Sequence, residues 1–227
     1  MVWGVIVAAG KSERMGSGVD KAFLSLGANK GLKGIGLFIN APTIFNTRTK
    51  IAKLADFAGR KIRVLAAAVQ MEQLRKLNAT PVPMPLGDVL PALQQGTIDG
   101  VMSVLPVLTA FRYYDAAKYI LESEQAMVSV VTVLSKIWYD NLPADLQAVL
   151  ADAGQRASAE VFPWAVEFIA KQRKVWTASG GELVQLSAAE HAELNKLLKP
   201  VGTEVTAAKP QEAALYALLQ KTAEKTA

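Results

Sequence analysis

The chain has 227 residues, enough for one large domain or two small ones, and 51% of them are apolar, enough to bury a core. Its formal net charge of +5 comes from scattered lysines and arginines, which favours a solvated basic surface and predicts no nucleic-acid partner. The lack of cysteine excludes disulfides, thiolate metal sites and cysteine nucleophiles.

Residues 1–30 predict a strand followed by a polar glycine loop. Residues 5–9 are apolar and end at Gly10, and the loop 11–21 comes next. No apolar run reaches the roughly 18 residues that span a bilayer, and no basic segment precedes the opening strand. We therefore expect no signal peptide in this chain. A cluster of breakers at residues 27–31 follows, and the character of the sequence changes there.

After this break, expected strands and helices alternate, which predicts an α/β fold. The expected strands are residues 32–40, 61–65, 98–103, 127–134 and 183–186, with 42–50 extended or in a loop. The expected helices are 69–77, 87–95, 108–118, 135–143, 143–178 with a kink near Pro163, and 210–224, with a short helical turn at 51–57. The segment 127–134 is richest in β-branched residues and is expected within a sheet, away from the surface.

Several local signals refine these boundaries. Residues 80–85 hold three prolines and are expected to form an extended connector, neither helix nor strand. Asp88 is expected to cap the next helix, and Gly96 to end it. Ser187 has the spacing of a capping box with a glutamate three residues later. The single histidine, His191, is expected on the surface of that helix, so no zinc site is predicted.

Five segments from residue 32 onward, in order, resemble the TRAP-type (DctP-like) solute-binding family. They are 54–64 (LADFAGRKIRV), 77–84 (LNATPVPM), 88–100 (DVLPALQQGTIDG), 114–119 (YDAAKY) and 142–147 (LPADLQ). Each segment alone is a weak signal, but five in register are specific. The resemblance therefore covers residues 31–227 as one solute-binding region.

The family resemblance implies an α/β, two-lobed fold of the periplasmic binding protein kind (type II, TRAP class), with a long helix joining the lobes. Members carry a longer stretch before the counterpart of Leu32, so the first lobe is expected to be incomplete here. The implied function is binding of a small organic acid, a carboxylate, between the lobes. The implied partners are the membrane subunits of a TRAP transporter, the implied location is the periplasm, and neither catalysis nor a cofactor is implied.

Arg63 is the principal expected ligand contact. In the family, the arginine of the K-x-R-V strand clamps the ligand carboxylate. A guanidinium offers two parallel donors to a carboxylate and stays charged when water is removed. The alternative is an arginine that pairs with a nearby carboxylate such as Asp88.

Other positions depart from the family pattern. Ser103 stands where members often carry asparagine, and a hydroxyl can still donate one hydrogen bond. A second family arginine is missing near residues 41–43, so Asn40, Thr43 and Asn46 are expected to bond the ligand from that side. Arg48 could add charge there.

Residues 1–27 resemble a different family, the cytidylyltransferases of isoprenoid synthesis (IspD type). The pattern is A-A-G-x-x-x-R-M-G followed by K-x-F-L-x-L-G. That resemblance implies phosphate contacts from Gly10, Lys11 and Gly16, catalytic roles for Arg14 and Lys21, bound Mg, and a cytoplasmic location.

The rest of the chain shows no counterpart of that enzyme's acidic metal-binding segment or substrate loops. The sequence therefore resembles a junction of two fragments, 1–30 and 31–227. A chimera or a misassembled reading frame is favoured over coincidence. Nucleotidyl transfer to methylerythritol phosphate is the alternative function, and we expect no turnover of CTP, because a loop without its supporting residues is poorly oriented.

Overall fold

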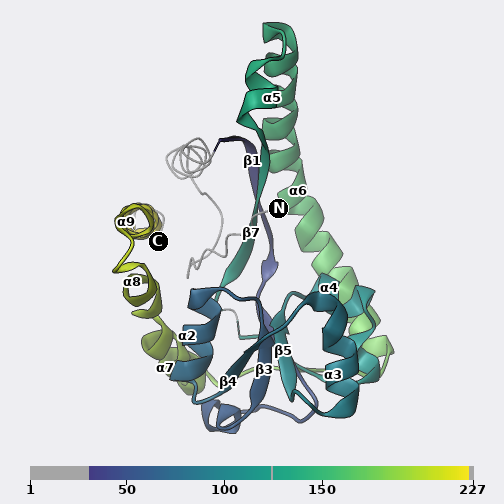
Figure 1. Ribbon diagram of the computed structural model, residues 1–227. Coiled ribbons are helices and arrows are strands. Elements are labelled where there is room, and N and C mark those ends of the chain that lie inside the picture. The colour runs from purple at the N-terminus through teal and green to yellow at the C-terminus, as the bar shows by residue number, and fades with distance from the viewer. Residues whose placement is uncertain (1–30, 124, 225–227) are drawn as a thin grey trace.

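The structure is a computed structural model that describes residues 31–123 and 125–224 (Figure 1). The strands are β1 Leu32–Pro42, β2 Ile44–Thr47, β3 Lys61–Val64, β4 Thr80–Pro83, β5 Gly100–Ser103, β6 Tyr119–Leu121, β7 Met127–Ser135 and β8 Glu182–Val184. The α-helices are α2 Ala68–Lys76, α3 Val89–Gln95, α4 Leu105–Ala110, α5 Lys136–Asp140, α6 Ala144–Ala178, α7 Ala188–Leu198, α8 Val201–Thr206 and α9 Pro210–Glu224. Short 3-10 turns are η1 Leu54–Phe57, η2 Leu86–Asp88 and η3 Tyr113–Asp115.

A six-stranded mixed sheet with the order β4-β3-β5-β2-β6-β8 forms the lower body of the molecule (Figure 1). Strands β4, β3 and β5 are parallel, as are β6 and β8, while β2 runs antiparallel to both of its neighbours. Helices α2, α7 and α8 cover one face, and α3, α4 and the end of α6 cover the other (Figure 1). This architecture confirms the predicted α/β class.

Alternation along the strands gives the sheet two separate apolar cores. Phe45, Ile62 and Met102 face α2 and α7, where Phe45 meets Phe57 edge to face at 4.8 Å between ring centroids. Ile44 and Val101 face α3 and α4 with Trp176 of α6. Burial on both faces makes this body the most rigidly packed part of the described chain.

A two-stranded antiparallel ribbon of β1 and β7 rises from the lower body, with α6 along it (Figure 1). The register shifts between Gly34 and Gly36, so that Ile35 bulges from the ladder. The bulged carbonyl of Ile35 lies against Gly154 of α6, where an added Cβ would be 2.1 Å from the oxygen. Ser158, one turn on, accepts the Leu37 N–H at 3.2 Å.

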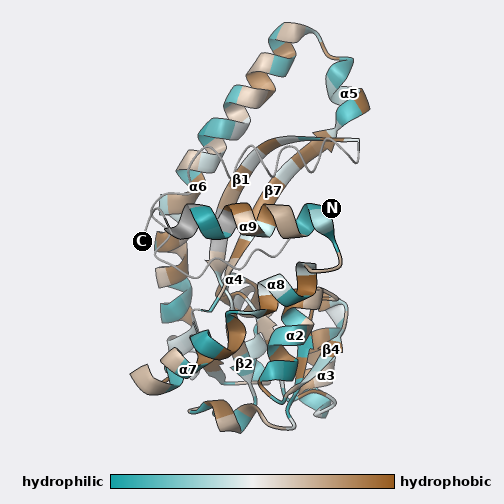
Figure 2. Ribbon diagram, turned by 90° about the vertical axis from the view of Figure 1, so that its left-hand side faces the viewer, coloured by the Kyte–Doolittle hydropathy of each residue, from teal (hydrophilic) through white to brown (hydrophobic). Residues whose placement is uncertain are grey.

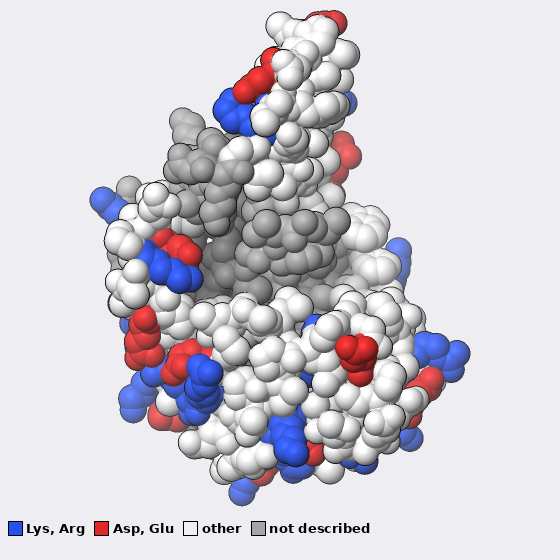
Figure 3. Space-filling model, viewed as in Figure 1, with Lys and Arg blue, Asp and Glu red and all other residues white. Residues whose placement is uncertain are grey.

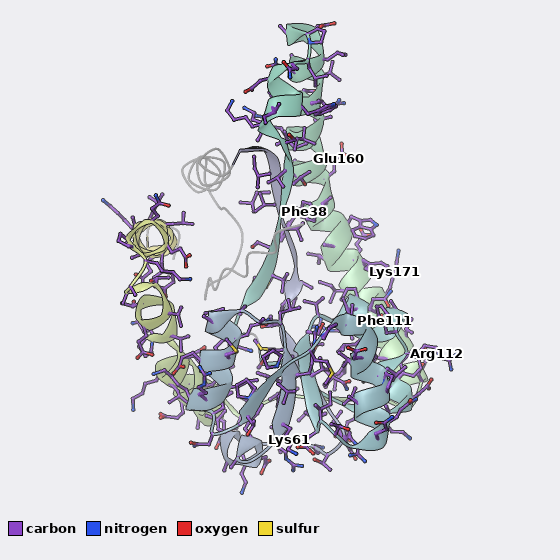
Figure 4. All side chains as sticks on the ribbon, viewed as in Figure 1. Phe38, Lys61, Phe111, Arg112, Glu160 and Lys171 are labelled. Carbon is purple, nitrogen blue, oxygen red and sulfur yellow. The ribbon has the colours of Figure 1, made fainter. Side chains whose placement is uncertain are left out.

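The 35-residue helix α6 connects the ribbon to the lower body. Its upper half packs on β1 through Gly154, and its end is anchored by Trp176, which is fully buried. The Trp176 indole donates to Lys118 O at 3.2 Å and meets the Tyr114 ring edge to face at 5.7 Å. Figure 4 shows Glu160 beside the ribbon and Lys171 near the body on this same helix.

Most predicted elements are confirmed. Strands at 32–40, 61–65 and 127–134, the helix at 69–77 and the final helix lie within about two residues of their predicted bounds. Gly96 ends α3 with φ 73, and Ser187 accepts the Glu190 N–H at 3.2 Å. The glutamate carboxylate itself bonds elsewhere, accepting the Leu54 N–H at 2.6 Å. The predictions for residues 1–30 concern a part of the chain outside the described residues.

Three predictions about elements are wrong. Residues 80–83 form the edge strand β4, because a strand with one neighbour tolerates proline. The helix predicted at 108–118 is α4, which starts earlier behind Pro106 and ends before Arg112, whose φ is 55. Asp88 makes no capping bond, because the 3-10 turn η2 continues the helix upstream of it.

The strand 127–134 is also less buried than expected. Among the described residues β7 pairs with β1 alone, and Ser129 is its one buried side chain. Figure 2 shows many hydrophobic residues on β1 and β7, and Trp138 and Trp164 of the neighbouring helices are 50% and 57% exposed. No helix of the described chain is long and apolar enough to cross a membrane. Helix α8 was not predicted.

Candidate functional site

Arg63 occupies the middle of β3, next to the strand that ends in Ser103. Arg63 is 2% exposed, and its Nε and Nη2 both donate to Met84 O, at 2.9 and 2.7 Å. Met84 follows β4, beyond the pair formed by Pro83 and Val64, so the guanidinium extends towards the carboxyl ends of the strands. This is the edge at which open α/β sheets bind ligands.

The charge of Arg63 has no carboxylate partner in the described chain, and no group there bonds its Nη1. The predicted alternative of an ion pair with Asp88 is therefore not found. Burial lowers the pKa of the Arg63 guanidinium, and the neighbouring Tyr113 opposes that shift. Burial raises the pKa of Tyr113 in turn, against the influence of Arg63. A buried arginine stays protonated, so the positive charge of Arg63 has no counter-ion within residues 31–123 and 125–224.

Ser103 lies near Arg63 on the same face of the sheet. Arg63 pairs with Val101 of the parallel neighbour β5, and Ser103 is two residues further along, so the side chains point the same way. The residue is half-buried, and its hydroxyl makes no hydrogen bond within the described chain. The structure thus brings Arg63 and Ser103 together at one edge.

Thr43 and Asn46, which were also predicted to bond the ligand, bond the protein backbone instead. Thr43 is fully buried and bonds Ala126 O through both its N–H, at 2.8 Å, and its hydroxyl, at 3.2 Å. Asn46 is also buried, and its Nδ2 donates to Ala117 O and Tyr119 O at 2.8 and 3.0 Å. The Asn46 amide therefore joins β2 to the start of β6, and Thr43 joins the residue before β2 to the residue before β7.

Two further predicted residues do not join Arg63. Arg48 lies beyond the opposite end of β2 and cannot add charge to this edge. Asn40 belongs to β1 at a register shift, and its side chain is outside what the structure describes.

Two polar residues at the carboxyl end of β6 were not predicted. Ser123 is fully buried and Gln125 is 3% exposed, yet within residues 31–123 and 125–224 the Ser123 hydroxyl and both amide atoms of Gln125 have no hydrogen-bond partner. The neighbouring Ala126 contacts Thr43, which places this segment at the same edge of the sheet. Their sequence signal was a polar run between two apolar strands, which does not reveal that Ser123 and Gln125 are buried.

The residues of the cytidylyltransferase-like stretch, Gly10, Lys11, Arg14, Gly16 and Lys21, all lie outside the described residues. Within residues 31–123 and 125–224, no group of three or more histidine and acidic side chains is placed to hold a metal ion.

The arrangement resembles that of known solute-binding proteins. The family model described as bacterial extracellular solute-binding protein, family 7 (DctP), matches residues 8–209. The match begins inside the stretch that resembles a cytidylyltransferase, and nothing in the comparisons supports that second family.

Two curated relatives show the extent of the similarity. The C4-dicarboxylate-binding periplasmic protein DctP of Rhodobacter capsulatus is 27% identical over 191 residues, covering 82% of this chain and 56% of the relative. An ectoine/5-hydroxyectoine-binding periplasmic protein of Ruegeria pomeroyi is 26% identical over 139 residues, covering 61% and 41%. The chain thus spans about half the length of the curated relatives it matches.

Solved structures share the fold. A TRAP periplasmic solute-binding protein of Shewanella oneidensis with bound succinate has a TM-score of 0.78 and 26% identity, with 88% of this chain and 66% of that chain covered. The periplasmic ectoine-binding protein of Halomonas elongata has a TM-score of 0.86 and 18% identity, covering 91% and 68%. With the family match over residues 8–209, this chain belongs to the DctP family of bacterial extracellular solute-binding proteins.

Proposed function

We propose that this protein binds a small organic acid through its carboxylate and delivers it to the membrane subunits of a TRAP transporter in the periplasm. The observation that carries the proposal is Arg63, a buried cation with no carboxylate partner among the described residues. A buried unpaired charge is costly, so a site that keeps one is suited to an anionic ligand. Such a protein works by binding and release, without catalysis or a cofactor.

The geometry around Arg63 supports a carboxylate in particular. The Met84 carbonyl accepts from Nε and Nη2 together and so fixes the plane of the guanidinium. Among the described residues nothing bonds Nη1 or the hydroxyl of Ser103, which lies on the same face of the sheet. A carboxylate would accept from the guanidinium with one oxygen and leave its other oxygen for a neutral donor.

Relatives bind ligands of this class. Their names and bound molecules include C4-dicarboxylates, 2,3-diketo-L-gulonate and succinate. Within the described chain, Arg63 is the one charged residue that is buried. A single buried cation suits one carboxylate group, so we expect a ligand with one carboxylate held deeply and the remainder held by neutral polar groups.

The proposal is tested first by thermal unfolding with a panel of organic acids and with CTP plus magnesium. A ligand that binds the native state alone raises the melting temperature. We expect a carboxylate to do so. A rise with CTP that Arg14→Ala or Lys21→Ala abolishes would instead support the nucleotidyltransferase alternative.

The role of Arg63 is then tested by calorimetry with the acid that stabilises the protein. Arg63→Ala should weaken binding by about 2–5 kcal/mol, because the ligand charge loses its buried partner. Arg63→Lys should recover part of this loss, since lysine keeps the charge but not the planar fork. Arg75→Ala is the matched control, because Arg75 is an exposed arginine paired with Glu72 on α2. Equal affinity of wild type and Arg63→Ala would refute the proposal.

A further inference from the structure

A polar cavity lies at the end of the six-stranded sheet opposite to the edge that holds Arg63. It has a volume of about 430 Å³, and the residues that line it are Arg48, Thr49, Arg60, Asp99, Ala116, Lys118 and Tyr119. Figure 4 shows Lys61, the residue after Arg60, at the lower end of the molecule, away from the ribbon. The cavity is therefore separate from the edge that holds Arg63 and Ser103.

The topology of the sheet gathers these residues. Arg60, Asp99 and Lys118 each precede the first residue of a strand, β3, β5 and β6, and these strands point the same way. Arg48 follows β2, which runs in the opposite direction between β5 and β6. Four neighbouring strand ends thus bring three cations and one carboxylate to a single edge.

The charges at this cavity are not balanced within the described chain. Arg48, Arg60 and Lys118 form no ion pair there, whereas the nearby Lys50 pairs with Glu182. Asp99 uses Oδ2 to accept the Lys61 N–H at 2.8 Å. The residues that line the cavity thus carry three positive charges and one negative charge, an excess of two, and the Asp56 carboxylate beside Arg60 lies outside this lining. Figure 3 shows basic side chains around this lower end of the molecule.

The cationic groups are positioned by the backbone around them. The Arg48 N–H donates to Asp99 O at 3.0 Å, and Thr47 Oγ1 donates to Thr49 O at 2.8 Å, which fixes the turn after β2. The Arg48 guanidinium lies against Gly96, where an added Cβ would be 2.6 Å from Nη1. Arg60 Nε donates to Asp56 O at 3.2 Å. Of the three cations, Arg60 is thus held by a side-chain hydrogen bond, and Arg48 lies beside Gly96, so these two lose less entropy when a ligand binds than free side chains would.

We propose that this cavity, the distal basic cavity, binds a small oxyanion that carries a charge near −2, such as inorganic phosphate or its esters. A dianion matches the charge excess of two. The volume of about 430 Å³ falls within the range of small-molecule sites and leaves room for a substituent on the anion. Asp99 keeps one oxygen that can accept a hydrogen bond from a protonated phosphate or a hydroxyl group.

The same phosphate chemistry is offered by two sources, a free anion and the headgroup of an anionic phospholipid. The cavity is formed by strand ends and turns, and two of its cations, Arg48 and Lys118, are exposed at its rim. We assign the free anion, because the three cations line one pocket formed by the ends of four strands. The experiment below separates the two sources.

Calorimetric titration with inorganic phosphate, at constant ionic strength set by chloride, tests the proposal on the full chain. We expect saturable binding to the wild type. The double variant Arg48→Gln/Lys118→Gln should bind at least about tenfold more weakly, since it lacks two charged donors. Lys50→Gln is the matched control, because it removes a cation of the same edge that does not line the cavity. Arg63→Gln should leave phosphate binding unchanged, which separates this site from the proposed carboxylate site.

Several results would overturn the proposal. They are the absence of phosphate binding to the wild type, equal binding by the double variant, and an equal loss in Lys50→Gln. Sedimentation with phosphatidylglycerol vesicles, against phosphatidylcholine vesicles, forms the second arm. Vesicle binding lost in the double variant, without binding of free phosphate, would assign the site to a lipid headgroup and overturn the free anion. Circular dichroism of each variant shows whether it is folded.

Discussion

Gln125 has a buried side-chain amide whose two polar atoms both lack a hydrogen-bond partner among the described residues. A buried unsatisfied polar group costs about 1–3 kcal/mol. Gln125→Met keeps the length of the side chain and removes both polar atoms. We expect this variant to raise the free energy of unfolding by up to about that amount, as measured by urea denaturation without ligand.

Gln70→Met is the matched control for this prediction. Gln70 is as buried as Gln125, but its Oε1 accepts the Leu65 N–H at 3.0 Å. Its replacement should therefore lower the free energy of unfolding. If Gln125→Met destabilises the protein as much as Gln70→Met does, the Gln125 amide already has a partner in solution.

The position of a site residue could be predicted from sequence where that residue belongs to a regular strand. Arg63 sits in a recognisable strand motif, and the strand direction places it at the expected edge, while its role as a ligand contact stays a prediction. Asn46 lies in β2 and Thr43 directly precedes that strand, but the side-chain donors of both residues bond backbone carbonyls of the protein. Ser123 and Gln125 were missed because their burial depends on contacts far away in the sequence, which composition and periodicity do not encode.

At the scale of elements, the contact of α6 with β1 depends on a missing side chain. Alanine is favoured over glycine in helices by about 1 kcal/mol, but a Cβ on Gly154 would lie 2.1 Å from Ile35 O. We expect Gly154→Ala to lower the free energy of unfolding, by about 1–3 kcal/mol or more, because backbone must move. Urea denaturation measures this change.

Gly87→Ala serves as the control for that variant. An added Cβ at Gly87 meets nothing within 4 Å, and Gly87 has no positive φ. The control should be neutral or slightly stabilising through the unfolded state. A stabilising effect of Gly154→Ala as well would show that α6 does not pack this closely on β1.

The turn η1 supplies a pH-dependent contribution to stability. The N–H of Ala52 donates to Asp56 Oδ2 at 2.9 Å, and this hydrogen bond is the main reason why the pKa of Asp56 lies below 3.8. Partial burial of the carboxylate raises its pKa, whereas the hydrogen bond from the Lys53 N–H lowers it further. The folded state thus binds the proton less readily than the unfolded state, so the contribution is present above pH 3.8 and is lost as pH falls through the folded pKa.

Asp56→Asn should therefore destabilise the protein at about pH 6 and have a smaller effect at about pH 3, where the wild-type carboxylate is itself becoming protonated. Urea denaturation of both proteins at the two pH values measures the difference. An equal loss at both values would mean that the hydrogen bonds, and not the charge, carry the contribution.

The errors in predicting elements have local physical causes. Residues 80–83 contain prolines, which suggest a connector, and yet an edge position satisfies them. The end of α4 was placed too late because a left-handed Arg112 leaves no mark in the pattern of apolar residues. The long helix and the final helix were predicted closely because many turns repeat the same signal.

At the scale of the whole molecule, the lower body and the ribbon should differ in local stability. The body buries both faces of six strands, whereas β1 and β7 form a two-stranded ribbon with mostly half-exposed side chains. Two strands alone are marginally stable. We expect amides of β7 to exchange hydrogen faster than those of β3 and β5, as measured by mass spectrometry on the ligand-free protein.

The comparison is internal to one molecule, so differences in sample conditions cancel. Peptides that cover β7 and β5 have similar compositions of apolar residues, and α6 lies along the ribbon. Equal protection of β7 and β5 would contradict the prediction and show that the ribbon is stabilised as strongly as the sheet.

The two prolines of β4 have a consequence for the protein in concentrated solution. Thr80 and Met84 donate their N–H groups inwards, to Arg60 O and Val64 O, so by alternation Pro81 and Pro83 face the open edge of the sheet. Proline has no N–H, and the outer side of β4 therefore presents no donors between these residues. A strand from another molecule cannot add to this edge, which protects the sheet from edge-to-edge aggregation.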